Sequence, residues 1–184
     1  SASVSPDRAW LLLMERPSMP SIAELSRPML RLAGTRIDPR TNGPNRTAGI
    51  TGLVLQRVDG GEERRVALPE GASLDFLRWS PDGRRIAAAN TGEDRVSLLV
   101  VDVESGLARE LTHTPLNATM GAPCAWMPDG ARLLCRLVPE GRGAEPVRPR
   151  VPVGPTIQEA GGNAAPVRTY QDPLQDAHAG ALFD

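Results

Sequence analysis

The apolar residues of this chain fall in short runs separated by turn residues, a pattern typical of β-strands rather than long helices. The clearest example spans residues 74–112, where four apolar runs are joined by three turn signals. At the first turn, Pro81 presets φ, Asp82 can bond its own backbone and Gly83 tolerates a positive φ. The pattern predicts a four-stranded antiparallel sheet, with strands at residues 74–79, 85–90, 96–103 and 107–112.

The third of these runs is apolar on both faces. Residues 96–103 read VSLLVVDV, whereas a strand with one face in water would alternate polar and apolar residues. Continuous apolarity indicates a sheet that is covered on both sides, as a propeller blade is by its two neighbours. Charged residues interrupt every apolar run long before the ~20 residues that a membrane span requires. We therefore interpret this stretch as one blade and expect no membrane span.

The turn recurs with similar flanks, which strengthens the propeller interpretation. Trp79 and Trp126 precede the second and third copies, and Val4 takes that place in the first. The spacing from Pro81 to Pro128 is 47 residues, close to the ~40–50 residues of a propeller repeat. An unrelated β-sandwich with three similar hairpins is the alternative. The three copies are SPDRAWLL at residues 5–12, SPDGRRIA at 80–87 and MPDGARLL at 127–134.

The resulting prediction is an all-β chain, a partial β-propeller with two proline-rich excursions. One complete blade (74–112) and parts of two others (4–68 and 121–184) are expected. A closed propeller needs at least four blades of four strands, so we expect the remaining blades elsewhere in a larger polypeptide. The apolar run at residues 181–184 is expected to begin a further strand.

The two excursions, residues 16–49 and 139–173, are too rich in proline for long helices. The first allows a short helical turn near residues 21–25, with Ser21 as its cap and Glu24 at the third position. Its apolar residues are expected to pack on a blade edge. The second should be largely extended, either as a functional lid or contact arm or as a disordered segment. The packing residues of the first are Leu30, Leu32 and Ile37.

Composition narrows the choice of partners. The chain has 184 residues, of which 40% are hydrophobic and only 3% aromatic, so aliphatic residues must build the core. Its net charge is −1, with neither a basic stripe nor a basic tail. This argues against nucleic acid or an anionic membrane as a main partner.

The two cysteines, Cys124 and Cys135, lie on the two arms of the third hairpin. A two-residue loop at Asp129-Gly130 would place them opposite each other, whereas a glycine bulge would send them to opposite faces. A disulfide is therefore one alternative, but two buried thiols are the favoured interpretation. Cysteine usage thus leaves the cellular compartment open.

No complete catalytic site is expected in this chain. It lacks a Gly-x-Ser-x-Gly motif, and its histidines, His113 and His178, are interpreted as surface residues. Two Cys and two His without short spacing make a weak metal site, so neither metal nor cofactor is predicted. The second excursion carries candidate substrate-binding arginines, whose forks suit bidentate capture of carboxylates. These are Arg142, Arg148, Arg150 and Arg168; arginines that only solubilise a loop are the alternative.

Three segments carry a resemblance to a known family. They are LRLAGTRIDP at residues 30–39, VPVGPTIQE at 151–159, and VRTYQD at 167–172 together with ALFD at 181–184. With the repeats, they resemble the amino-terminal propeller of prolyl oligopeptidase-type serine peptidases (family S9), and most closely the glutamyl endopeptidase branch. The resemblance covers nearly the whole chain, and its landmarks fall in the excursions rather than in generic turns.

The resemblance implies a peptidase that pairs the propeller with an α/β-hydrolase domain carrying a Ser-Asp-His triad. The propeller would cover that domain and limit access to peptides, with cleavage after acidic residues in the glutamyl branch. No residue here matches the hydrolase motif, so the implied partners are the rest of the same polypeptide and a peptide substrate. A TolB-like binding propeller without catalysis is the alternative. Such peptidases are expected in the periplasm or secreted, with the cytoplasm as the other option.

Overall fold

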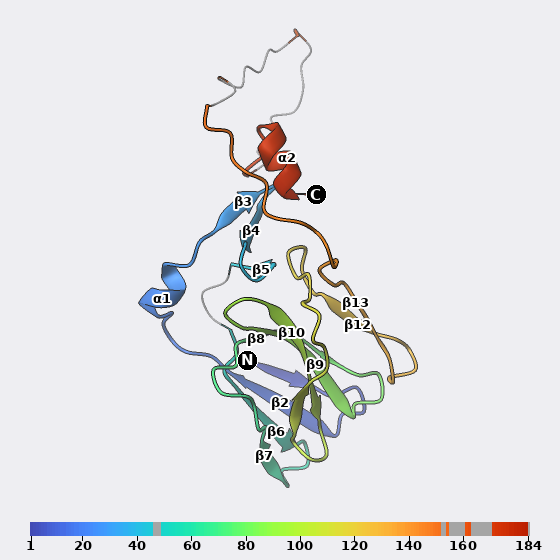
Figure 1. The fold of residues 1–184 in the computed structure, drawn as a ribbon. Coiled ribbons are helices and arrows are strands. Elements are labelled where there is room, and N and C mark those ends of the chain that lie inside the picture. Colours follow the sequence, from blue (N-terminus) through green and yellow to red (C-terminus); the bar gives the residue numbers. More distant parts are fainter. Residues whose placement is uncertain (46–48, 152–153, 155–160, 163–170, 184) are drawn as a thin grey trace.

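The computed structural model describes residues 1–45, 49–151, 154, 161–162 and 171–183. Its described part is all-β apart from two short helices, which confirms the all-β part of the predicted fold class. Two four-stranded antiparallel sheets form the lower part of the molecule (Figure 1). The first contains β1 (Ala2–Val4), β2 (Trp10–Glu15), β6 (Gly52–Arg57) and β7 (Glu63–Arg65), and the second contains β8 (Leu74–Trp79), β9 (Arg85–Thr91), β10 (Val96–Asp102) and β11 (Ala108–Glu110).

The second sheet confirms the four strands predicted for residues 74–112. The first sheet is more complete than expected, because β1 pairs with β2 from Ala2 to Val4 and supplies the fourth strand. The described residues do not form a closed ring of sheets.

The three repeated turns, which begin at Ser5, Ser80 and Met127 and are called corners below, share one geometry. In each, two backbone bonds close a four-residue loop, for example from Ser80 N–H to the Arg85 carbonyl (2.8 Å) and from Gly83 N–H to the Ser80 carbonyl (2.9 Å). The fourth residue of each corner, counted from Ser5, Ser80 or Met127 as the first, has a positive φ: Arg8 (60°), Gly83 (71°) and Gly130 (66°). The sequence repeat is therefore also a structural repeat.

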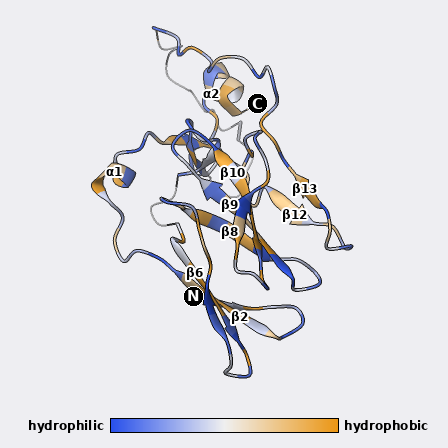
Figure 2. Ribbon diagram, turned by 60° about the horizontal axis from the view of Figure 1, so that its bottom comes forward, coloured by the Kyte–Doolittle hydropathy of each residue, from blue (hydrophilic) through white to orange (hydrophobic). Residues whose placement is uncertain are grey.

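The second sheet is covered on both faces, as the apolar run at residues 96–103 predicted. On one face, Ile86, Leu99 and Val101 pack against Leu12, Leu53 and Leu55 of the first sheet. On the other, Ala87, Leu98 and Val100 pack with residues of a third layer. Figure 2 shows the hydrophobic colouring of β10, which lies at the centre of these contacts.

The third layer is a hairpin of β12 (Cys124–Trp126) and β13 (Leu133–Cys135). Cys124 and Cys135 lie directly opposite each other and form a disulfide, so the favoured interpretation of two buried thiols was wrong. The loop spans four residues rather than two. An even number keeps the register of the two-residue loop, and Gly130 introduces no single-residue shift.

The first excursion is more ordered than its prolines suggested. It contains α1 (Ile22–Leu25) and a three-stranded sheet of β3 (Leu30–Leu32), β4 (Thr35–Asp38) and β5 (Gly43–Pro44). Helix α1 has the predicted cap: Glu24 N–H donates to Ser21 Oγ, and Ser21 N–H donates to the Glu24 carboxylate.

The second excursion leads to α2 (Ala177–Phe183), which lies beside β3 and β4 above the two large sheets (Figure 1). The strand expected at residues 181–184 was wrong, because residues 181–183 form the end of this helix. Asp176 caps it, since its carboxylate accepts a hydrogen bond from Ala179 N–H (2.7 Å). A local cap thus outweighed the strand propensity of a short apolar run.

Candidate functional site

Two of the sequence landmarks meet at a hollow of about 460 Å³, which we call the α2 hollow. Strand β3 lines one side with Leu30, Arg31 and Leu32, and α2 with the turn before it lines another. The second excursion contributes residues 145, 146, 148, 172 and 173. Leu30 and Leu32, which were predicted to pack on a blade edge, line this hollow.

Local turn chemistry positions the β3 side of the hollow. Ala33 and Gly34 both have positive φ, 47° and 79°, as the central residues of a type I′ turn do. This turn pairs Leu30 with Ile37, and the Thr35 hydroxyl donates to the Leu32 carbonyl (2.6 Å). A tight hairpin thus positions Arg31 where it lines the hollow.

The hollow carries both signs of charge. Arg31 and Arg148 line it together with three carboxylates, and no ion pair among the described residues joins these groups. His178 is half-buried and its Nε2 lies 3.0 Å from the Pro146 carbonyl oxygen, which tethers α2 to the second excursion. The expectation of a surface histidine is therefore only partly correct for His178. The carboxylates belong to Glu145, Asp172 and Asp176.

This arrangement can bind a polar ligand through its charges. Among the described residues that line it, none is a Ser, Thr or Cys that could act as a nucleophile. The described residues also hold no group of three or more His, Cys, Asp or Glu suited to a metal ion. The hollow is thus a candidate contact site for a polar ligand.

The four candidate arginines do not gather around one point. Arg148 lines the α2 hollow, whereas the Arg142 guanidinium donates to Asn42 Oδ1 at the turn before β5. Arg150 is exposed and does not line the hollow. Arg168 lies outside the described residues.

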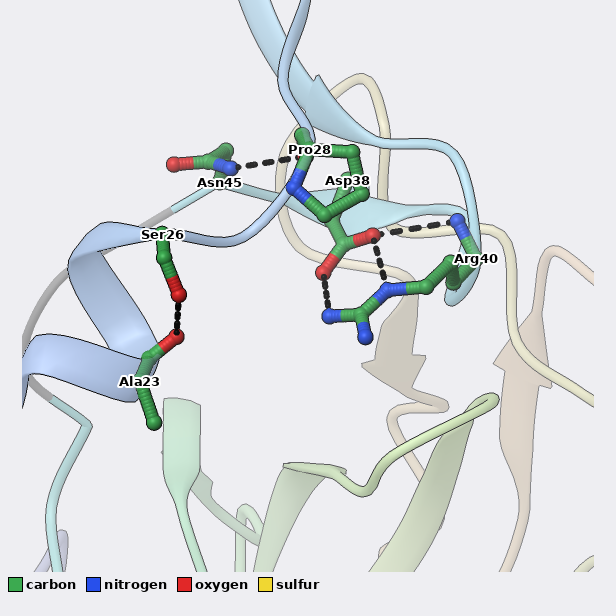
Figure 3. A network of polar contacts seen from close by, with 6 residues as sticks. All are labelled: Ala23, Ser26, Pro28, Asp38, Arg40 and Asn45. Atoms are coloured by element: carbon green, nitrogen blue, oxygen red, sulfur yellow. Dashed lines mark hydrogen bonds and ion pairs between the residues drawn. The ribbon is translucent and has the colours of Figure 1, made fainter.

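A buried carboxylate at the end of β4 binds Arg40 in the turn that follows (Figure 3). Asp38 is 2% exposed, and its carboxylate accepts hydrogen bonds from Arg40 N–H (3.0 Å) and from the Arg40 guanidinium (Nη2, 3.0 Å). Its hydrogen bonds and charge raise the pKa of Arg40 above its ordinary value. The Asn45 amide donates to the Pro28 carbonyl (3.1 Å), which ties the segment after α1 to the end of β5.

The remaining candidates add no site. His113 is exposed, as predicted. In the described chain, no helix is both long and apolar enough to cross a membrane.

The comparisons with known proteins agree with the resemblance seen in the sequence. The chain is 37% identical over 197 aligned residues to a protein of Oryza sativa subsp. japonica named "Probable glutamyl endopeptidase, chloroplastic". It is 35% identical over 196 residues to a protein of the same name in Arabidopsis thaliana. Both alignments cover 99% of this chain but only 20–21% of the relatives. No protein-family model matches.

The resemblance to glutamyl endopeptidases is thus confirmed, over a segment that spans about a fifth of the relatives' length. Sequence reasoning missed Arg31 and Glu145 as residues of the α2 hollow. Arg31 lies within the first landmark, so the landmarks themselves were the signal that could have located it.

Proposed function

We propose, from this homology to a segment of two plant glutamyl endopeptidases, that the chain is part of the propeller of a serine peptidase. The parent enzyme would be of the prolyl oligopeptidase type and would cleave after Glu or Asp. This segment would limit access to a hydrolase domain elsewhere in the same polypeptide. The observation that carries the proposal is the identity of 35–37% over nearly every residue of the chain.

The stacked sheets support the propeller part of the proposal. A blade must bury both of its faces, and sheet β8–β11 does so. The corners repeat with one geometry at Ser5, Ser80 and Met127, as identical blades around an axis require. A binding propeller without catalysis would show the same repeats, so the enzyme assay below decides between the two.

The disulfide bears on the compartment. Cys124 and Cys135 are bonded, and disulfides persist mainly in oxidising compartments. This supports a periplasmic or secreted location. Fractionation of the source cells, followed by thiol mapping of Cys124 and Cys135, tests it; recovery of the protein in the cytoplasm with both thiols free would contradict it.

The test of activity uses the full-length protein encoded by the gene. We expect cleavage of short peptides after Glu, and inhibition by a fluorophosphonate that modifies one active-site serine. Peptides with Gln in place of Glu should be cleaved much more slowly. A full-length protein that binds no fluorophosphonate and cleaves none of these peptides would favour the binding propeller.

The α2 hollow is the proposed place where this segment contacts substrate. Arg148 lines it and Arg150 does not, so Arg150→Ala is a matched control for Arg148→Ala. We expect Arg148→Ala to raise KM several-fold for peptides rich in acidic residues, with little change in kcat, because the arginine would bind substrate away from the reacting bond. Equal KM values for the two variants would show that the α2 hollow does not bind substrate.

A further inference from the structure

Positions related by the corner repeat have the same surroundings in the first two sheets but not in the third layer. The seventh residue after the start of each corner is Leu12, Ala87 and Leu134. Leu12 is 1% exposed and faces the second sheet, and Ala87 is 4% exposed and faces the β12–β13 hairpin. Leu134 is 70% exposed. In the first two sheets the face that carries this residue is covered by the next layer. The equivalent face of the β12–β13 hairpin is uncovered.

Polar contacts repeat across the two filled interfaces. The indole N–H of Trp79 donates to Ser3 Oγ (3.1 Å), and that of Trp126 donates to the Arg78 carbonyl (3.0 Å). In both interfaces, the tryptophan directly before one corner donates to the previous corner's sheet, at the residue two positions ahead of that corner's first residue. The equivalent acceptor on the hairpin is Ala125, which pairs with Leu134 on the exposed face.

Each corner also lies against the corner that precedes it along the chain. A Cβ at Gly83 would lie 3.1 Å from the Asp7 carboxylate carbon, and one at Gly130 would lie 3.4 Å from that of Asp82. Each corner glycine thus sits against the aspartate of the corner before it. Asp129 is the equivalent residue on the hairpin.

We propose that the exposed face of the β12–β13 hairpin, formed by Ala125, Asp129 and Leu134, docks a further four-stranded antiparallel sheet of the same polypeptide. That sheet carries a corner of the type Trp-x-Pro-Asp-Gly. Its tryptophan indole donates at Ala125, its glycine lies against Asp129, and its apolar face covers Leu134. The inference rests on the proposed propeller and names which surface continues it and by which contacts.

A second copy of this chain does not fit as the occupant. The other open face of the stack belongs to the first sheet, around a hollow of about 620 Å³ lined by Val4, Arg8 and Leu11 among others. At the two positions that make the repeated contact, this face carries Val4 instead of tryptophan and Arg8 instead of glycine. The relatives are about five times as long as this chain, which provides residues for a further sheet.

Hydroxyl-radical footprinting of the full-length protein tests the proposal without a substitution. Leu134 should be oxidised at least tenfold more slowly than Val147, which is 90% exposed, and Ile22, which is 85% exposed. All three should react similarly in urea. Oxidation of Leu134 at the rate of Val147 in the native protein would overturn the proposal.

Two further measurements keep the outcomes distinct. Protection of Leu134 that disappears when an oligomer is diluted to the monomer would assign the face to a second copy and would also overturn the proposal. In the monomer, Leu134→Asp should lower Tm by several degrees, whereas Val147→Asp should not. Peptidase activity is assayed separately, so a protected Leu134 in an inactive protein would reject the enzyme and keep the docked sheet.

Discussion

The sheet β8–β11 buries aliphatic residues on both faces, whereas the sheet β3–β5 is held in place largely by polar groups. In the former, Ile86, Leu99 and Val101 are fully buried. In the latter, the buried residues include Leu32 but also Asp38, whose carboxylate accepts hydrogen bonds from the Arg40 backbone and guanidinium. We infer that the two large sheets and the β12–β13 hairpin, together called the stack, form the stable scaffold. The α2 hollow belongs to a region with little apolar burial of its own.

The largest effect is expected in the centre of the stack. Leu99→Ala should lower the local unfolding free energy of β9 and β10 by about 2–5 kcal/mol, because it removes a fully buried side chain and leaves a cavity. Leu30→Ala, at a half-buried site in β3, should cost about 1 kcal/mol. Hydrogen exchange of the full-length protein measures both. Equal losses would break the contrast between the two regions.

The second largest effect on stability is expected from loss of the disulfide. Cys124 and Cys135 are separated by 11 residues, and closing a loop of this order stabilises by about 2–3 kcal/mol. The double Cys→Ala variant should therefore lose protection in β12 and β13. Dithiothreitol should lower Tm of the wild type and leave that of the double variant unchanged; a wild-type Tm that is insensitive to the reductant would contradict this.

A polar substitution should affect the other region. Asp38→Ala removes the acceptor of the Arg40 backbone and side-chain bonds and should cost about 1–3 kcal/mol locally. We expect faster exchange in β4 and β5 with unchanged exchange in β9 and β10. Faster exchange in all four strands would show that the two regions unfold together.

Within the stack, the same corner position should respond with opposite signs. Gly83→Ala should destabilise by about 1–2 kcal/mol, because φ is 71° and the new Cβ would approach the Asp7 carboxylate. Arg8→Gly should stabilise by up to about 1 kcal/mol, because it relieves a φ of 60°. Thermal unfolding of both variants is the measurement, and shifts of the same sign would refute the shared corner geometry.

The smallest expected effect is on the acid side of the stability profile. The Ser5 and Ser80 hydroxyls, followed by backbone N–H groups, lower the pKa of Asp7 and Asp82. Because the folded pKa lies below the unfolded value of about 3.9, this stabilisation is complete above that value and is lost as pH falls through the folded pKa. Asp82→Asn should flatten the decline of Tm below about pH 4; an unchanged slope would argue against the coupling.

Local rules explain what could be read from the chain. The corners, the cap of α1 and the double-sided burial of residues 96–102 each follow from neighbouring residues, and all were predicted. The α2 hollow was not, because its sides come from β3 and from residues more than 110 positions later. The periodicity of apolar residues along the chain carries no information about contacts between residues so far apart in the sequence.

The sequence by itself determined the all-β class, the corner repeat and the glutamyl endopeptidase resemblance, since propensity, turn chemistry and motif are properties of contiguous residues. Only the tertiary structure decided that Cys124 and Cys135 are bonded, that residues 181–183 end a helix, and that Leu134 stands exposed where Leu12 and Ala87 are covered. These outcomes depend on which strands lie face to face, and that choice is made by packing across the whole chain.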